Sequence, residues 1–286
     1  MLTIHFTSGL GNQLFQYFFG ESLRLNHNYT NVNYIESTLA PYQINIWDIF
    51  DTNINWKESN IKNKFLLINL FKLLIKFKFE KKFNIVSDNS IVLHKNYYSY
   101  NSFNFYGYWQ NISYFEKEFS NIRKNLIYKK KIILQNLIKK YDQYSDVVGI
   151  HIRGGDYLLK KNQKLFSNIN REYYSKSINF LKNKLDNPLF LIFSDDENYS
   201  KKLINFIGGS FIFAKDINDN RNDDFQLLSK CDHFIIPNST FSWWAASLSN
   251  SLKKIVIMPK EWFKEDIANF NVDITSLNQN IDLHNI

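Results

Sequence analysis

The chain has 286 residues, of which 44% are hydrophobic and 17% aromatic, and its formal net charge is +8. This composition predicts a globular protein with a full core and excludes disordered and collagen-like chains. The length is enough for two compact α/β halves. The positive charge favours anionic partners such as nucleotides, nucleic acid or an acidic membrane face.

The single cysteine, Cys231, cannot form an intramolecular disulfide, which fits a reducing compartment. A predicted strand over residues 2–6 opens the chain, which lacks the basic and then apolar plan of a signal peptide. No apolar run reaches the length of a membrane span. We therefore expect a cytoplasmic location. Nucleic acid is the weaker partner, because the sequence has no zinc spacing and no RNA-recognition signature.

The turn Thr7-Ser-Gly-Leu-Gly-Asn-Gln13 follows this strand and precedes a helical pattern. A strand, a glycine turn and a helix resemble the start of a nucleotide-binding unit, although the G-x-G-x-x-G spacing is absent. The amides of Gly11 and Asn12 would point at an anion placed at the helix N-terminus. Alternatively, Gly9 and Gly11 only make a tight turn.

Residues 65–79 are almost continuously apolar, and Asn69, Lys72, Lys76 and Glu80 recur at three- and four-residue steps. On a helix these four side chains would form one narrow polar stripe. The segment therefore predicts a mostly buried helix. The alternative is a helix on a membrane surface, whose lysines face the lipid head groups.

Residues 105–109 form an aromatic, strand-like stretch. Tyr108, Trp109 and Gln110 could stack on a sugar and hydrogen-bond to it, although aromatic strands more often lie in a core. A lysine-rich helical pattern follows up to about residue 141. We place the domain boundary between residues 143 and 144.

Beyond the boundary, strands and helices alternate, which predicts a parallel sheet with helices on both faces. The predicted strands cover residues 146–152, 189–193, 211–213, 234–236 and 255–258, and helices begin near residues 173, 224 and 239. Ligands of open α/β sheets bind at the carboxyl ends of the strands. The residues that follow these strands are therefore the candidates for a site.

The heptapeptide His151-Ile-Arg-Gly-Gly-Asp-Tyr157 follows the first of these strands. Arg153 offers a planar fork of donors suited to a phosphate or a carboxylate. Gly154 and Gly155 let backbone N–H groups approach that anion. Asp156 could orient Arg153 or accept a proton. The alternative interpretation is a surface turn with a few charged residues.

Two more motifs follow predicted strands. In Ser194-Asp-Asp196, the acids Asp195 and Asp196 could accept hydrogen bonds from a ribose or a purine, or could cap the next helix. In the block that starts at Pro237, polar side chains crowd the start of an apolar helix, whose free amides and dipole would suit a phosphate. Ordinary capping by Asn238 or Ser239 is the alternative.

Taken together, these motifs resemble glycosyltransferase family 11, the bacterial α-1,2-fucosyltransferases. The matching pieces run in family order over nearly the whole chain; they are Gly9-Leu-Gly-Asn-Gln-Leu-Phe-Gln-Tyr17, residues 151–157, Phe193-Ser-Asp-Asp196, residues 224–229 and residues 237–246. The resemblance implies an α/β fold of GT-B type, with two Rossmann-like halves whose parallel sheets face a cleft. Residues 1–143 would form the acceptor-side domain and residues 144–286 the domain that binds GDP-fucose.

The resemblance also implies an activity. The chain would move L-fucose from GDP-β-L-fucose to the 2-hydroxyl of a β-galactoside, with inversion at the anomeric carbon and without a metal or another cofactor. The acceptor would be an O-antigen or a related surface glycan, which can be carried on a lipid diphosphate. Such an acceptor, together with the positive charge, leads us to expect weak, salt-reversible attachment to the inner membrane surface.

The site residues follow from the matched motifs. Arg153 and Asp156 are the catalytic candidates, the arginine for the diphosphate and the acid as general base or orienting group. The expected donor-binding residues are Gly11, Asn12, Gln13, His151, Arg153, Asp195, Asp196, Asn238, Ser239, Thr240, Phe241 and Ser242. The chain departs from the family pattern at Gly154, where a second arginine is usual.

Other functions remain open at this point. The chain could transfer a different sugar from GDP or form a different linkage. It could also be a nucleotide- or carbohydrate-binding protein without turnover, which only Gly154 supports. A nucleic-acid-binding protein rests on the net charge alone.

Overall fold

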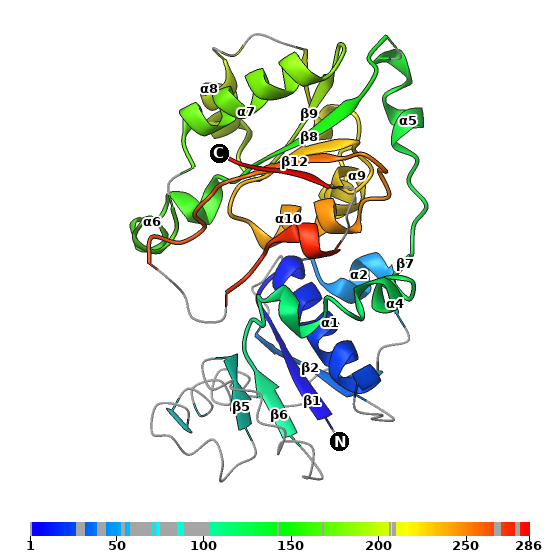
Figure 1. Cartoon of the computed structure of the whole chain (residues 1–286), viewed down its shortest axis with the longest axis vertical. Coiled ribbons are helices and arrows are strands. Elements are labelled where there is room, and N and C mark those ends of the chain that lie inside the picture. The colour runs from blue at the N-terminus through cyan, green and yellow to red at the C-terminus, as the bar shows by residue number, and fades with distance from the viewer. Residues whose placement is uncertain are drawn as a thin grey trace. The chain divides into compact units, whose positions relative to one another are not determined.

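The computed structural model describes residues 2–26, 32–38, 44–52, 55–57, 70, 73–74, 85–88, 103–141, 143–167, 169–205, 207, 210–265, 270–277 and 281–286. The chain forms two compact units, each built on its own parallel sheet (Figure 1). The first unit comprises Met1–Lys129 and Ala268–Asp273, and the second comprises Lys130–Ile267 and Ile274–Ile286. The predicted α/β class with two Rossmann-like halves is confirmed.

The two units divide earlier in the chain than the boundary placed between residues 143 and 144. Residues from Lys130 on belong to the second unit. There the Gln226 side chain donates to the carbonyl of Lys130 at 2.7 Å, and the Lys130 ammonium pairs with Asp223 at 2.5 Å. A lysine-rich pattern on its own does not reveal these long-range contacts.

The sheet of the first unit has the order β4-β2-β1-β6-β5 and is parallel throughout. Its central strand β1 is buried along its whole length, as expected for a parallel strand covered on both faces. The helix α1 follows β1 directly. The bounds of these elements are β1 Leu2–Thr7, α1 Leu10–Asn26, β2 Val32–Thr38, β4 Asn55–Lys57, β5 Ile85–Ser87 and β6 Phe103–Tyr106.

Short elements complete this unit, and β3 pairs with β7 in an antiparallel ladder. They are α2 Ile46–Ile49, β3 Phe50–Asp51, η4 Ile112–Tyr114, α4 Phe119–Arg123 and β7 Ile127–Tyr128. Trp109 has no exposed surface, and its ring stacks on Phe19 with centroids 4.0 Å apart. The core interpretation of this tryptophan is therefore confirmed, whereas Tyr108 is half exposed.

The sheet of the second unit has the order β10-β9-β8-β11-β12-β13, again parallel throughout. Its strands are β8 Val147–Ile152, β9 Leu189–Ser194, β10 Phe211–Phe213, β11 His233–Ile235, β12 Ile255–Met258 and β13 Asp282–Asn285. Five of them match the predicted strands. The sixth, β13, was not predicted, because only Leu283 in it is strongly apolar.

Helices cover both faces of this sheet, as predicted. On one face Val148, Ile150 and Ile152 of β8 pack with residues of α7 and α8. On the other face α9 approaches so closely that a Cβ at Gly149 would lie 2.6 Å from Leu228. The helical elements are α5 Leu134–Leu137, η5 Lys139–Tyr141, η6 Gly155–Leu158, α6 Lys160–Leu165, α7 Arg171–Lys184, α8 Glu197–Ile204, η7 Ala214–Asp216, η8 Arg221–Asp223, α9 Asp224–Leu228, α10 Thr240–Leu248 and η9 Ile274–Leu277.

The buried side chain of Lys254 binds the C-terminal end of α10. The Lys254 side chain is fully buried, and its ammonium donates to the carbonyls of Ala246 at 2.7 Å and Ser249 at 3.1 Å. Both carbonyls lie at the C-terminal end of the helix, where the dipole favours a positive charge. Cys231 is buried, as expected for a small apolar side chain.

The predicted helix over residues 65–79 lies almost entirely outside the described residues. The choice between a buried helix and a helix on a membrane surface therefore stays a prediction. Within the described ranges, no helix combines the length and the apolar composition needed to cross a bilayer.

The Gln16 side chain joins α1 to the end of β1 and to Gly107, the residue that follows β6. Its fully buried amide accepts from the Thr7 N–H at 3.0 Å and donates to the Thr7 hydroxyl at 2.9 Å and the Gly107 carbonyl at 2.8 Å. The change Gln16→Met keeps the length of the side chain but leaves buried groups unpaired, so we expect a loss of about 3 kcal/mol in the free energy of unfolding.

Urea denaturation measures this loss through the midpoint and slope of the transition. Gln135→Met is the matched control, because Gln135 is exposed on α5. Equal midpoints for the two variants would contradict a structural role of the Gln16 amide.

Candidate functional site

The strand order of the second sheet reverses at β8. The chain runs from β8 outward to β9 and β10 and then returns to place β11 on the other side of β8. Ligands of open α/β sheets bind outside the carboxyl ends of the strands at such a switch point. The residues that follow the two strands there are Arg153 after β8 and Asn238 after β11.

The Asp195 carboxylate holds the turn after β8. One of its oxygens, Oδ2, lies 2.7 Å from Nη1 of Arg153, and the other, Oδ1, accepts from the Gly154 N–H at 2.7 Å. Both charged side chains stay partly open, with 30% of the arginine and 26% of the aspartate exposed. The expected meeting of Arg153 with Asp195 at one sheet edge is observed. The two oxygens of Asp195, which were expected to accept hydrogen bonds from a ribose or a purine, contact Arg153 and the Gly154 amide instead.

The two glycines of this turn leave no room for side chains. Gly155 has φ +40°, and a Cβ there would lie 2.8 Å from Oδ2 of Asp195. A Cβ at Gly154 would lie 2.7 Å from the Cβ of Asp196. A second arginine at position 154 would therefore require Asp196 to move.

Asp196 begins α8. Its carboxylate accepts from the Tyr199 N–H at 2.9 Å, which is the bond of an N-cap. Of the two roles weighed for this acid, helix capping is the one observed. A hydrogen bond that Asp196 accepted from a bound nucleotide would have to share that oxygen or use the other one.

His151 is buried against α10. Its Nδ1 lies 2.8 Å from the Ser242 hydroxyl, and its ring packs on Phe241 with centroids 5.4 Å apart. Burial, together with the positive charge of Arg153, lowers the pKa of His151 to about 3. The imidazole is therefore neutral at neutral pH and adds no positive charge for a phosphate. With 4% of its surface exposed, His151 contacts the first turn of α10 through Ser242 and Phe241, and its assignment to the donor site stays a prediction.

The polar block after β11 differs from simple capping. The Ser239 side chain makes no capping bond, although Ser239 is the N-cap residue of α10. The Asn238 amide instead donates to the carbonyls of Ser167 at 3.1 Å and Trp262 at 2.8 Å. Ser242 is fully buried and contacts His151, while Thr240 and Phe241 are half-buried. Asn238 thus joins three loops at the carboxyl edge, and the Ser242 hydroxyl is out of reach of a ligand.

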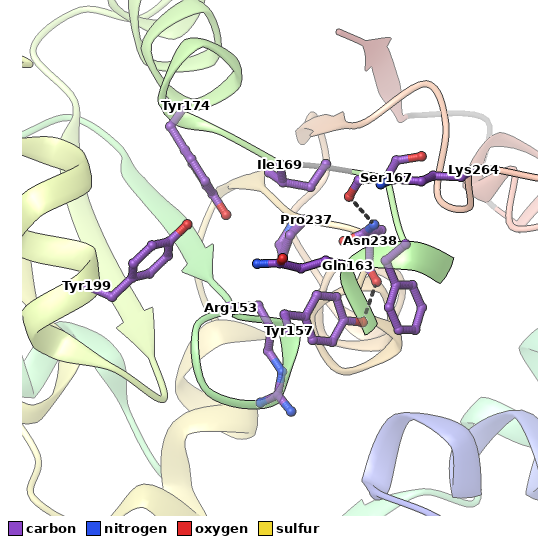
Figure 2. A pocket seen from close by; sticks show the side chains of 11 residues that line it. Arg153, Tyr157, Gln163, Ser167, Ile169, Tyr174, Tyr199, Pro237, Asn238 and Lys264 are labelled. Carbon is purple, nitrogen blue, oxygen red and sulfur yellow. Dashed lines mark hydrogen bonds between the residues drawn. The ribbon is translucent and has the colours of Figure 1, made fainter. Parts of the chain in front are cut away.

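A cavity of about 230 Å³ opens at this edge, beside Arg153 (Figure 2). The Tyr157 hydroxyl donates to the Asn238 carbonyl at 2.8 Å across one wall. The cavity is lined by Arg153, Tyr157, Gln163, Phe166, Ser167, Ile169, Tyr174, Tyr199, Pro237, Asn238 and Lys264. Most of these residues were missed from the sequence, because they come from helices and loops without a motif.

The glycine turn of the first unit is closed by its own hydrogen bonds. The amides of Asn12 and Gln13 donate to the Gly9 carbonyl at 3.0 and 3.1 Å. The Asn12 side chain accepts from Gln110 at 2.7 Å. The expectation that the Asn12 amide is open to an anion is therefore wrong, because the first helical turn already uses it.

The Gln13 side chain is also fully used. It donates to the Ser8 carbonyl at 2.9 Å and to Asn45 at 3.1 Å, and it accepts from the Ile46 N–H at 3.0 Å. Gln13 therefore shapes the turn and joins it to α2. Gly11 is buried in the same turn, and these three residues belong to a different unit from Arg153.

Two further acids, Asp156 and Asp224, lie in the motifs that were singled out in the sequence. Asp156 lies in η6, but its side chain is outside what the structure describes. Asp224 begins α9, and burial raises its pKa to about 7, with Arg221 opposing the shift and Asp223 adding to it. Asp224 belongs to the matched motif at residues 224–229 and lies where a helix was expected to begin. Over the described ranges, no three His, Cys, Asp or Glu side chains cluster as metal ligands.

The profile of Glycosyl transferase family 11 matches residues 1–277. The chain belongs to this family. An Escherichia coli α-1,2-colitosyltransferase is 33% identical over 91% of this chain and 92% of its own length. The Escherichia coli O-antigen biosynthesis glycosyltransferase WbnK is 25% identical, over 90% of this chain and 93% of its own length. This family 11 chain is therefore a glycosyltransferase.

A solved structure supports the fold. The Bradyrhizobium fucosyltransferase NodZ superposes with a TM-score of 0.51 at 10% identity, over 86% of this chain and 91% of that chain. At this identity the likeness concerns the fold alone. The GT-B type expected for a family 11 glycosyltransferase is confirmed.

The carboxylate of Asp195 should act by positioning. In Asp195→Asn the amide oxygen can still accept from Gly154, but the ion pair with Arg153 is lost. We expect turnover to fall about tenfold, because the guanidinium is no longer held in one orientation. Affinity for GDP should not fall, because a carboxylate that competes for the same cation has been removed.

Steady-state kinetics and calorimetric titration with GDP separate these two effects. Asp219→Asn is the matched control, because Asp219 is exposed in the loop before η8. A parallel loss of GDP affinity and turnover in Asp195→Asn would argue against a positioning role.

Proposed function

We propose that the chain is an inverting glycosyltransferase that moves L-fucose from GDP-β-L-fucose to the 2-hydroxyl of a β-galactoside. The observation that carries the proposal is the turn after β8, where Asp195 holds Arg153 at the switch point of the sheet in a family 11 chain. A fixed guanidinium there suits a diphosphate, because its planar fork matches two phosphate oxygens.

The chemistry follows from the leaving group. The acceptor oxygen bonds to the anomeric carbon as the bond from that carbon to the diphosphate oxygen breaks, and GDP departs with the bonding electrons. Arg153 stabilises the charge that develops on the diphosphate, and the first amides of α10 are the further candidates for that task. In this proposal neither a metal ion nor another cofactor takes part.

The acceptor hydroxyl must lose its proton during the transfer. Asp156, three residues after Arg153, is the proposed general base or the group that orients the arginine. Inversion needs a single displacement, so the proposal includes no covalent nucleophile. Among the expected donor-binding residues, Asn238, Ser239, Thr240 and Phe241 would contribute through the backbone and the loop that they shape.

A second donor has a specific observation in its favour. The Escherichia coli relative that covers 91% of this chain is an α-1,2-colitosyltransferase. Colitose is the 3-deoxy form of L-fucose, so the two donor sugars differ by one hydroxyl group. GDP-colitose is therefore the competing donor for the same site and the same linkage.

The acceptor is proposed as an O-antigen or related surface glycan, and the similarity to WbnK supports this. If that glycan is carried on a lipid diphosphate, a net charge of +8 favours weak attachment to an anionic membrane surface. Vesicle co-sedimentation at low and high salt measures this attachment. Protein that stays in the supernatant with anionic vesicles at low salt would remove the membrane from the proposal.

The decisive experiment incubates the protein with GDP-fucose, GDP-colitose or GDP-mannose and a panel of β-galactosides, with and without EDTA. We expect transfer from GDP-fucose that EDTA does not abolish, and linkage analysis should place the new sugar on O2. Preference for GDP-colitose would establish the second donor. Tight GDP binding without any product would mean a binding protein, and transfer to another oxygen would refute the linkage.

We expect the turnover rate to depend strongly on the guanidinium of Arg153. We expect Arg153→Ala to lose roughly two to three powers of ten in turnover, the scale for removing one preorganised charge-stabilising donor. Arg153→Lys should rescue little, because a point charge cannot copy the bidentate fork. Single-turnover rates at saturating donor check this, with Arg171→Ala, exposed on α7, as the control. Near-normal turnover of Arg153→Ala would assign the diphosphate charge to another residue.

A further inference from the structure

Two buried polar atoms at the cavity beside Arg153 have no hydrogen-bond partner among the described residues. They are Oγ of Ser167 and Oδ1 of Asn238, and both side chains line the cavity (Figure 2). Asn238 is 2% exposed, so bulk water does not pair with its oxygen. Buried polar groups in folded proteins are nearly always paired, which makes two such atoms at one cavity a sign of a missing ligand group.

The orientation of the Asn238 amide is fixed by its own bonds. Its nitrogen donates to the carbonyls of Ser167 and Trp262, so the oxygen is the atom left over. That oxygen can only accept a hydrogen bond, whereas the Ser167 hydroxyl can donate or accept after rotation about one bond. A ligand that suits both atoms offers hydroxyl groups.

The size of the cavity limits the ligand to one ring. Its volume of about 230 Å³ is below the range of roughly 300–1,000 Å³ typical of sites for drug-sized ligands. Its walls also include Phe166, Ile169 and Tyr199, which give it an apolar surface. A monosaccharide with hydroxyl groups and an apolar C–H face, or a methyl group, matches both kinds of wall.

The position of Arg153 selects which ring of a sugar nucleotide lies there. Arg153 lines the cavity itself, and the proposed function assigns the diphosphate to this arginine. The transferred sugar is bonded directly to that diphosphate, whereas the base is separated from it by the ribose. The ring that reaches the cavity next to Arg153 is therefore the sugar.

We propose that Ser167 and Asn238 receive hydroxyl groups of the transferred monosaccharide and thereby determine which donor sugar the chain accepts. This inference rests on the proposed function, because it needs a sugar diphosphate at Arg153. A sugar that lacks the matching hydroxyl leaves a buried polar atom unpaired, and sites of this kind reject such analogues more strongly than apolar pockets reject a missing methylene group.

The experiment compares Ser167→Ala with the wild type in titrations with GDP and with GDP-fucose. We expect equal affinity for GDP and a five- to tenfold weaker affinity for GDP-fucose in the variant, because one hydrogen bond to the sugar is lost. Ser120→Ala, exposed on α4, is the matched control and should bind both ligands as the wild type does.

Donors that lack single hydroxyl groups give a second measurement that needs no new variant to fold. The wild type should bind at least one of the 2-, 3- and 4-deoxy forms of GDP-fucose more weakly. Ser167→Ala should bind that form and GDP-fucose equally, because the partner of the missing hydroxyl is already absent.

The other possible results of these titrations show whether the inference or the proposed function is wrong. An equal loss of affinity for GDP and GDP-fucose in Ser167→Ala would place the nucleoside in the cavity and overturn the inference. Unchanged donor affinity with a raised KM for the acceptor would place the acceptor sugar there and also overturn it, as would no change at all. A wild-type protein that binds no GDP would instead refute the proposed function.

Discussion

The pairing of β8 with β9 on one side and β11 on the other determines the arrangement of the second unit. Because all three strands are parallel, the residues that follow them emerge at the same edge of the sheet. Arg153 and Asp195 meet there across neighbouring strands, and Asn238 emerges on the opposite side of the same strand end. A shift of one residue in either pairing would turn the alternate side chains to the wrong face and separate these groups.

Electrostatics at this edge depends on which charges are already neutralised. Asp195 balances the charge of Arg153, which lowers the cost of holding a guanidinium over a partly buried turn. His151 stays neutral because burial and the nearby arginine oppose its protonation. The turn after β8 therefore presents one oriented cation, and the adjacent buried imidazole adds no second charge. The net charge of +8 favours anionic partners at long range, whereas the turn after β8 fixes the direction of a single guanidinium.

The sequence predicted five of the six strands of the second sheet, their parallel direction and the convergence of three motifs, because each motif follows a buried apolar run. It could not identify the side chains with which each of these residues pairs. Whether Asp195 pairs with an arginine or with a ribose depends on the neighbouring strand, and whether Trp109 faces a sugar or Phe19 depends on the path of the chain. Most of the cavity walls were also missed, since the segments near residues 166 and 263 are distant in the sequence and meet through a bridge and a ring contact.

The close contact between Gly154 and Asp196 couples two positions that are 42 residues apart in the chain. Any side chain at position 154 displaces the aspartate that starts α8, and the first turn of that helix moves with it. A substitution at Gly154 therefore acts on the N-terminus of α8 as well as on the turn that carries Arg153.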